Sequence, residues 1–270
     1  MGQRGKPLVE PVKVGLQDPP QVNAQMVAVI DEGSGQVLYA YNEHQRTPPA
    51  SITKIATAIV AIEHGNLNSI VKVDYDPTEL YDSTAMGCNP GDWFTLEDLL
   101  YGLMLPSGND AALAIANYIA GDEKTFVQMM NDKVRELGLT DTHFVNPHGL
   151  HDDDHYTSAY DIAMLARYGM MTSATFRHLA AATYWDVHGS KSYRIFNLNR
   201  LLSGDTRYPL ADGVKIGYTE QAGRTTVASA TKNGHRVYVA ALHVGDTVGD
   251  IVPLFEWVWN NFEWQDVSGN

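Results

Sequence analysis

A long apolar run in the first quarter of the chain reads Ser51-Ile52-Thr53-Lys54-Ile55-Ala56-Thr57-Ala58-Ile59-Val60-Ala61-Ile62 and is soon followed by Gly65. Its apolar residues fall on several faces of a helix, so we expect a buried helix that ends near the glycine. A serine and a lysine stand at its start with the spacing S-x-x-K. Because residues i and i+3 share one face of a helix, the hydroxyl of Ser51 and the amine of Lys54 are expected to touch.

Strand-like segments lie on both sides of this helix along the chain. Residues 25–30 and 36–41 flank a turn, and residues 224–230 and 236–243 flank Asn233-Gly234, a typical hairpin turn. The intervening sequence has mainly helical periodicity, and an aromatic helix is expected over 251–264. The sequence therefore predicts an α/β (α+β) protein in which strands from both chain ends form one mainly antiparallel sheet flanked by helices, beside an all-helical lobe.

The 270 residues allow one large domain or two small lobes. We interpret the polar, proline-rich residues 1–22 as an N-terminal leader or tail and residues 23–265 as a single catalytic domain. Its α/β lobe is expected over about 23–75 and 185–265, and its helical lobe over about 76–184. A cleft between two such lobes is a natural ligand site.

The composition narrows the class of protein. With 44% hydrophobic residues the chain has ample material for a core, and its net charge of −13 repels phosphate backbones, which argues against a nucleic-acid partner. No apolar run approaches the ~18 residues needed to span a membrane, and the first residues lack the apolar core of a signal peptide. A single cysteine, Cys88, allows no intramolecular disulfide and no multi-cysteine zinc site.

Three short patterns bear on chemistry: S-x-x-K, S-x-N and K-x-G. Each occurs more than once, so the expected structure around each copy must select among them. The copy Ser69–Lys72 falls on a strand, where residues three apart face opposite ways, and Ser229–Lys232 ends a strand. The copy Ser268-Gly269-Asn270 is the chain terminus, and of the K-x-G copies Lys13 is in the leader and Lys232 in a turn. Ser51–Lys54, Ser107-Gly108-Asn109 and Lys215-Ile216-Gly217 remain.

These residues suit nucleophilic catalysis. A serine hydroxyl becomes a nucleophile when a base takes its proton, and Lys54 is that base if burial and the charge of Lys215 keep it neutral. The Ser51 N–H at the helix start and an N–H of the strand after Lys215 would form an oxyanion hole. Ser107 would relay a proton to the leaving amine, Asn109 would orient a substrate amide, and Lys215 would be a permanent cation for a substrate carboxylate.

Four blocks of the chain resemble those of the low-molecular-mass serine D-Ala-D-Ala carboxypeptidases, a penicillin-binding protein family (peptidase family S11, DacA-like). The resemblance extends over roughly residues 23–264 and includes the order and spacing of the motifs. The blocks are Pro49-Ala50-Ser51-Ile52-Thr53-Lys54, Leu105-Pro106-Ser107-Gly108-Asn109-Asp110-Ala111-Ala112, Phe144-Val145-Asn146-Pro147-His148-Gly149-Leu150 and Asp212-Gly213-Val214-Lys215-Ile216-Gly217-Tyr218-Thr219.

This resemblance implies a β-lactamase/transpeptidase-like fold with the active-site cleft between its lobes. It implies that the penultimate D-Ala carbonyl of a peptidoglycan stem peptide acylates Ser51, that terminal D-Ala leaves, and that water releases the acyl-enzyme. β-Lactam antibiotics would mimic the substrate and trap Ser51. The Tyr218 N–H would be the second oxyanion donor, Thr219 would help hold the terminal carboxylate, and Gly217 would line the same substrate-binding strand.

The resemblance also implies an extracytoplasmic enzyme, in the periplasm or cell wall, whose export signal has been removed, and one without a metal or organic cofactor. A contiguous acidic and histidine-rich run, residues 148–155, has no helical spacing to present metal ligands, so we interpret it as a solvated loop. Many relatives continue into a β-rich second domain, and none is expected within this chain.

One residue departs from the family pattern. Ile216 stands where the family has threonine, and it removes a hydroxyl that is expected to help bind the carboxylate. This departure leaves a non-catalytic peptidoglycan-binding relative as one alternative. A β-lactamase-like hydrolase is the other, although class A members carry a deacylating glutamate in E-x-x-L-N and the nearest stretch, Glu63-His64-Gly65-Asn66-Leu67-Asn68, does not match it.

Overall fold

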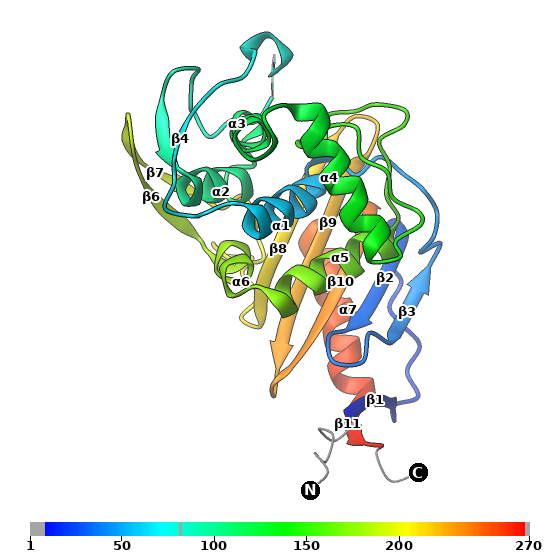
Figure 1. Cartoon of the computed structure of the whole chain (residues 1–270). Coiled ribbons are helices and arrows are strands. Elements are labelled where there is room, and N and C mark those ends of the chain that lie inside the picture. Colours follow the sequence, from blue (N-terminus) through cyan, green and yellow to red (C-terminus); the bar gives the residue numbers. More distant parts are fainter. Residues whose placement is uncertain (1–8, 81–82, 268–270) are drawn as a thin grey trace, which may run out of the picture.

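A five-stranded antiparallel sheet forms the centre of the computed structural model, which describes residues 9–80 and 83–267 (Figure 1). The strand order is β3-β2-β10-β9-β8, so the two N-terminal strands lie beside the three C-terminal strands, and every neighbouring pair is antiparallel. The strands are β2 (Ala24–Asp31), β3 (Val37–Tyr41), β8 (Ala211–Thr219), β9 (Gly223–Lys232) and β10 (His235–Val244). The predicted mainly antiparallel sheet built from both chain ends is therefore confirmed.

Local turn chemistry sets the register of the β9–β10 hairpin. Asn233 and Gly234 both have positive φ, 52° and 83°, which the two central residues of a type I′ turn require. His235 then pairs with Lys232, and the register continues to Leu242 opposite Thr225 before a bulge. The same strand pairs on its other edge with β2, where Val239 lies opposite Val29.

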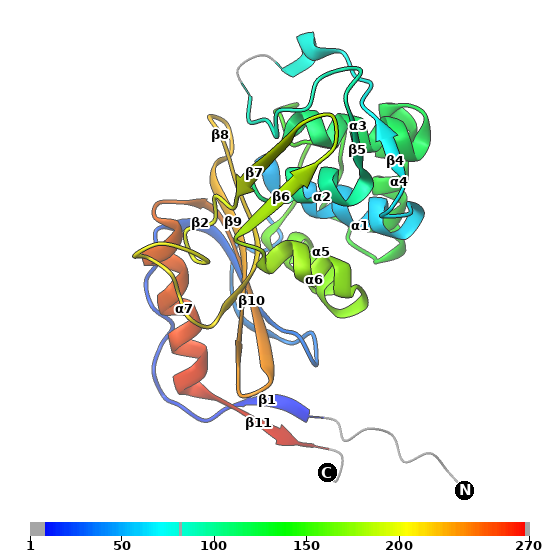
Figure 2. The same cartoon turned by 90° about the vertical axis from the view of Figure 1, so that its left-hand side faces the viewer.

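Helices cover both faces of the sheet (Figure 2). α7 (Thr247–Asn261) packs on one face, while α5 (Ala159–Thr172) and α6 (Ala174–Ala181) contact the other. The residues of β2 divide between the two faces with the period of a strand: Val27 and Val29 belong to the core against α7, and Ala28 and Ile30 to the core against the other helices. Residues 159–181 thus lie on the sheet, although their range falls in the expected helical lobe.

α1 (Lys54–His64) lies at the centre of the helical layer and is buried from Lys54 through Ala61, as its apolar pattern predicts. It contacts α5 and α6 on the sheet side and three further helices: α2 (Leu96–Met104), α3 (Asn109–Ala120) and α4 (Glu123–Glu136). A capping box formed by Thr95 and Asp98 starts α2. None of the helices within the described ranges is long and apolar enough to cross a membrane.

Short elements complete this layer. A 3-10 turn, η1 (Ala50–Thr53), leads directly into α1, and a second, η2 (Pro77–Leu80), precedes the gap in the described residues. Two small hairpin-like sheets pair β4 (Ile70–Lys72) with β5 (Trp93–Thr95) and β6 (Tyr184–His188) with β7 (Ser192–Phe196).

The segment interpreted as a leader contains a strand. β1 (Val9–Lys13) pairs antiparallel with β11 (Phe262–Asp266), and the two lie side by side at the lower end of the molecule in both ribbon views (Figures 1 and 2). The indole of Trp257 donates to the Gln17 carbonyl at 3.0 Å, which ties the same segment to α7. The expected helix over 251–264 is therefore displaced: α7 begins four residues earlier, and it ends at Asn261 because Phe262 is already extended and starts β11. Residues 1–8 of the leader and the Ser268–Asn270 copy of S-x-N lie outside the described residues.

Packing of α7 on the sheet gives a testable consequence. Phe255 is fully buried between α7 and the sheet, so Phe255→Ala is expected to lower the free energy of unfolding by about 3–5 kcal/mol, which urea denaturation would measure. Phe196→Ala is the matched control, because that ring is 61% exposed on β7 and its loss should cost no more than about 0.5 kcal/mol. Equal losses in the two variants would contradict this account of the core.

Candidate active site

The hydroxyl of Ser51 and the amine of Lys54 are in contact. The turn η1 ends as α1 begins, and this places Lys54 Nζ 2.9 Å from Ser51 Oγ. The contact predicted from the S-x-x-K spacing is present. Ala50, the residue just before the serine, has a φ of 54°, an uncommon conformation for a residue with a Cβ. The backbone that presents Ser51 is therefore strained, and tertiary contacts must hold it.

Two further oxygens hold the amine of Lys54. Asn109 Oδ1 lies 2.6 Å from Nζ, and the backbone carbonyl of His148 lies at 2.7 Å. Both are acceptors that have no hydrogen to donate. A neutral amine has two hydrogens and one lone pair, so when both hydrogens go to these acceptors the lone pair faces Ser51. This geometry allows the amine to accept the serine proton.

Burial favours the neutral amine. Lys54 is completely inaccessible to solvent, and burial together with the nearby charge of Lys215 holds the pKa of Lys54 well below its ordinary value, against a smaller opposing effect of Asp110. Asp110 makes no hydrogen bond to the lysine. Its carboxylate instead accepts from the backbone N–H groups of residues 86, 87 and 88 at 2.8–2.9 Å.

Ser107 and Asn109 reach the site from the start of α3. Asn109 is the first residue of the helix, and the N-cap is Gly108, so the hydroxyl of Ser107 caps nothing. Ser107 is 4% exposed, has a φ of 66°, and its Oγ is buried without a hydrogen-bond partner among the described residues. An unpartnered buried hydroxyl beside the site is free to bond a substrate or an intermediate.

β8 forms the other wall of the site. A Cβ on Gly217 would lie 2.7 Å from the Ser51 backbone nitrogen, so only glycine permits this close approach of β8 to η1. The strand on the other side is tied to the same turn, because Thr225 Oγ1 of β9 donates to the Pro49 carbonyl at 2.8 Å. The nucleophile is thus held against the edge of the central sheet.

Lys215 differs from expectation. Its side chain is 2% exposed, its Nζ donates to the Ile216 carbonyl at 3.1 Å, and burial lowers its pKa to about 7. At neutral pH the amine is therefore a mixture of charged and neutral forms. It is a buried partner for the site and not the permanent cation that the sequence led us to expect.

A loop that the sequence suggested was solvated supports the nucleophile. His148 and His155 are both buried, and burial lowers the pKa of each to about 3, so both imidazoles are neutral. The Val145 N–H donates to His155 Nδ1 at 2.9 Å, which leaves Nε2–H to donate to Thr53 Oγ1 at 2.8 Å. A Cβ on Gly149 would meet the Ala50 carbonyl, so the loop packs directly on the strained turn.

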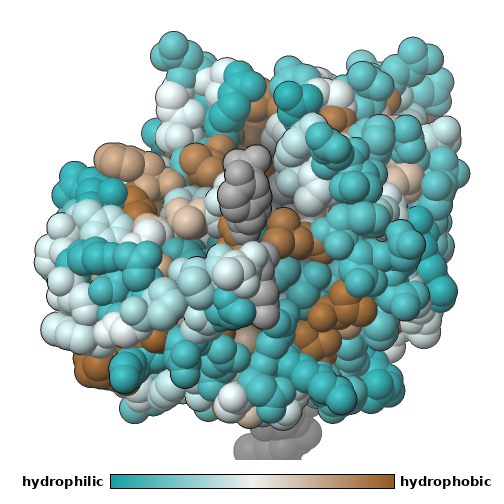
Figure 3. Space-filling view, turned by 90° about the horizontal axis from the view of Figure 1, so that it is seen from above, coloured by the Kyte–Doolittle hydropathy of each residue, from teal (hydrophilic) through white to brown (hydrophobic). Residues whose placement is uncertain are grey.

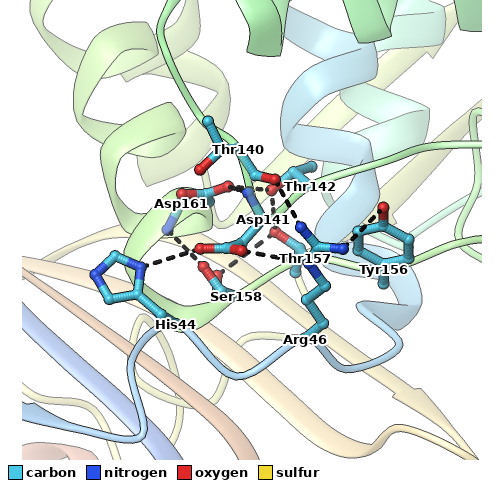
Figure 4. A network of polar contacts seen from close by, with 9 residues as sticks. All are labelled: His44, Arg46, Thr140, Asp141, Thr142, Tyr156, Thr157, Ser158 and Asp161. Atoms are coloured by element: carbon cyan, nitrogen blue, oxygen red, sulfur yellow. Dashed lines mark hydrogen bonds and ion pairs between the residues drawn. The ribbon is translucent and has the colours of Figure 1, made fainter.

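A polar network anchors this loop to the segment that enters η1 (Figure 4). Asp141 accepts from His44 and Arg46 at 3.1 and 3.3 Å, and its backbone N–H donates to Asp161 of α5 at 2.7 Å. Thr47 and Thr157 exchange backbone hydrogen bonds nearby. The loop that presents the His148 carbonyl is therefore fixed at its base. Across the described residues, no cluster of His, Cys, Asp or Glu side chains is arranged to hold a metal ion.

The site opens into a cleft with a volume of about 780 Å³. It is lined by predicted residues from all three motifs: Ser51, Ser107, Asn109, Gly217, Tyr218 and Thr219. Lys54 and Lys215 lie buried beneath it. The end of the molecule seen from above is mostly hydrophilic, with hydrophobic side chains gathered near its middle (Figure 3).

Several cleft residues were not anticipated. Arg200 and Arg224 line it together with Glu220, Asp246 and Thr247, which come from loops, the start of β9 and the start of α7. No short pattern marks such residues, because the chain brings them together only after the sheet has formed. Glu63, the glutamate nearest to the E-x-x-L-N pattern, lies about 14 Å further along α1 than Lys54 and is paired with Lys133 at 2.9 Å.

Comparison with known proteins identifies the family of this chain. Residues 13–245 match the model of the family described as D-alanyl-D-alanine carboxypeptidase. The chain is 38% identical to the D-alanyl-D-alanine carboxypeptidase DacF of Bacillus subtilis over 224 residues, which are 79% of this chain and 55% of the relative. It is 35% identical to DacB2 of Mycobacterium tuberculosis over 88% of this chain and 83% of that protein.

The fold agrees with this comparison. The crystal structure of penicillin binding protein 6B from Escherichia coli superposes with a TM-score of 0.84 at 32% identity, and the match includes 94% of this chain and 83% of that one. The chain spans 55–65% of the length of the first curated relatives it matches. On the family match, the relatives and the β-lactamase/transpeptidase-like fold, this chain belongs to the D-alanyl-D-alanine carboxypeptidase family of penicillin-binding proteins.

Proposed function

We propose that this protein is a serine-type D-Ala-D-Ala carboxypeptidase that removes terminal D-Ala from peptidoglycan stem peptides through an acyl-enzyme on Ser51. The observation that carries the proposal is the 2.9 Å contact between Ser51 Oγ and a buried amine whose other partners are both pure acceptors. Membership of a family named for this activity supports it. Lys54, Ser107, Asn109, Lys215, Gly217, Tyr218 and Thr219 are the further residues proposed to act in the site.

In the acylation step Ser51 Oγ attacks the penultimate D-Ala carbonyl while its proton passes to Lys54 Nζ. The negative charge on the carbonyl oxygen is received by two backbone N–H groups, proposed to be those of Ser51 and Tyr218. The peptide C–N bond then breaks, and the leaving amine takes a proton relayed through Ser107. Free D-Ala departs and an ester remains on Ser51.

In the deacylation step a water molecule attacks that ester, and the lysine amine accepts its proton in the same way. The C–O bond to Ser51 breaks, the serine regains its proton, and the shortened peptide leaves with a new carboxylate. β-Lactams would enter the same path and remain as esters on Ser51. An enzyme with this substrate acts outside the cytoplasmic membrane, and we propose that location for it.

Two alternatives have less support. A β-lactamase-like hydrolase would need a carboxylate base for deacylation, and Glu63 is engaged by Lys133 and by Tyr168, whose hydroxyl lies at 2.6 Å. A non-catalytic peptidoglycan-binding relative is favoured by Ile216 alone. A protein that only binds peptidoglycan has no need of a buried amine in contact with a serine and two acceptor oxygens, as Lys54 is.

Labelling by a penicillin tests the nucleophile. Intact mass spectrometry is expected to show one stable adduct on the wild-type protein and none on Ser51→Ala, because that variant has no hydroxyl to acylate. Ser69→Ala is the matched control, since it removes the serine of another S-x-x-K copy and should be labelled in full. An adduct that persists in Ser51→Ala, or is lost in Ser69→Ala, would contradict the assignment.

The pH dependence of acylation tests the base. Lys54 acts in its neutral form, so the rate of penicillin acylation should rise with pH through the lowered pKa of Lys54, with a midpoint well below 10.5. Because the charge of Lys215 helps to lower this pKa, Lys215→Met should move the midpoint to higher pH. A stopped-flow pH–rate profile measures both. A midpoint near the ordinary lysine value would show that Lys54 is not the base.

The substitution of Ile216 tests recognition of the carboxylate. Ile216→Thr should lower KM for a D-Ala-D-Ala peptide by about 10-fold or more, because a hydroxyl–carboxylate hydrogen bond contributes about 1.5–3 kcal/mol. Ile216→Val is the matched control, since valine has the shape of threonine without its hydroxyl. Steady-state kinetics of D-Ala release would measure the effect, and equal KM values for the two variants would contradict it.

A further inference from the structure

Two arginines in the cleft have no acidic partner in the part of the chain that the structure describes. Arg200 and Arg224 line the cleft, and neither forms an ion pair with a carboxylate among the described residues. The chain carries 32 acidic residues against 19 lysines and arginines, so acidic partners are abundant. Outside the cleft, Arg46, Arg135, Arg194 and Arg236 pair with carboxylates, whereas Arg167 and Arg177 donate to backbone carbonyls. The cleft therefore keeps positive charge available for a ligand.

The backbone of Arg224 is fixed beside the proposed oxyanion hole. In the β8–β9 register Arg224 lies directly opposite Tyr218, and directly opposed residues on antiparallel strands have Cβ atoms about 5 Å apart. The next residue, Thr225, is buried and bonded to the turn that carries the nucleophile. Arg224 Nη1 donates to the Gly245 carbonyl at 3.4 Å, which holds the guanidinium at the rim of the cleft.

β8 itself supplies little fixed charge. The pKa of Lys215 is about 7, so its amine is charged only part of the time at neutral pH, and it is buried below the cleft. Ile216, which lines the cleft, has no hydroxyl. A guanidinium, in contrast, stays protonated at any physiological pH and offers two parallel N–H groups to a carboxylate. The terminal carboxylate of the substrate must lie next to the scissile bond, and therefore close to this part of β8.

We propose that Arg224 binds the C-terminal carboxylate of the substrate and makes this enzyme selective for peptides that end in a free carboxylate. This inference rests on the proposed carboxypeptidase function. Arg224 would make a charge-assisted pair of hydrogen bonds at the rim and so replace the hydroxyl that Ile216 lacks. Glu220 and Asp246, which line the same cleft, would repel a carboxylate placed elsewhere in it.

The experiment compares two substrates that differ only at the terminus. One is a peptide that ends in D-Ala-D-Ala with a free carboxylate, and the other is its C-terminal amide. In Arg224→Gln, kcat/KM for the carboxylate substrate should fall by about 10–100-fold, mainly through KM, while the value for the amide changes less than about twofold. Arg224→Lys should lie between, because an ammonium keeps the charge without the paired N–H groups.

The control is Arg207→Gln, which removes the same charge from an exposed arginine that does not line the cleft, and both substrates should keep their wild-type rates. Equal losses on both substrates in Arg224→Gln would overturn the inference, because a structural defect has that signature. A selective loss confined to Arg200→Gln would also overturn it. Absence of D-Ala release and of Ser51 acylation in the wild-type protein would overturn the proposed function, whereas an active but unselective enzyme would overturn this inference alone.

Discussion

Burial of the Lys54 amine without a contacting carboxylate is the constraint on which the site depends. An ammonium group in this position is unfavourable because it has left water and gained no anionic partner within hydrogen-bond distance. The charge of Asp110 acts on it, yet that carboxylate is occupied by four backbone N–H groups. The amine is held by two neutral acceptors and a serine, which together suit its uncharged form. In the proposed mechanism Ser51 therefore faces a base that needs no further activation.

The scaffold maintains this arrangement against local strain. Ala50, the residue before Ser51, and Ser107, which lines the same cleft, both have positive φ, and each such residue costs of order 1–3 kcal/mol. Contacts across the fold offset this cost: Thr225 holds the turn before Ser51 from the sheet side, and Gly149 packs on it from the loop side. The network around Asp141 then fixes that loop (Figure 4). The turn keeps its strained conformation because contacts from the sheet, α3 and the loop all hold it.

Short sequence patterns predicted those structural features that depend only on residues close together in the chain. The spacing of Ser51 and Lys54 and the turn at Asn233-Gly234 both concern residues within a few positions of one another, and each is present. The β1–β11 pair joins residues more than 240 positions apart, and the local hydrophobic periodicity of neither segment predicts this pairing. The carbonyl of His148 was missed for a related reason, since every residue has a carbonyl and only tertiary structure selects one. The burial of Lys215 likewise depends on what folds over it, so its charge state was beyond the reach of the sequence.

Lysine and arginine are therefore not interchangeable within this cleft. A base must lose its proton at the working pH, and burial achieves this for an amine but not for a guanidinium, whose pKa remains far above it. A guanidinium at Lys54 would leave Ser51 beside a permanent charge with no lone pair to accept its proton. Binding a carboxylate at the rim has the opposite requirement, because the binding group must stay positively charged across the same pH range. The lysines lie buried beneath the cleft and Arg200 and Arg224 are exposed at its surface, so in the proposed mechanism depth in the fold separates proton transfer from charge recognition.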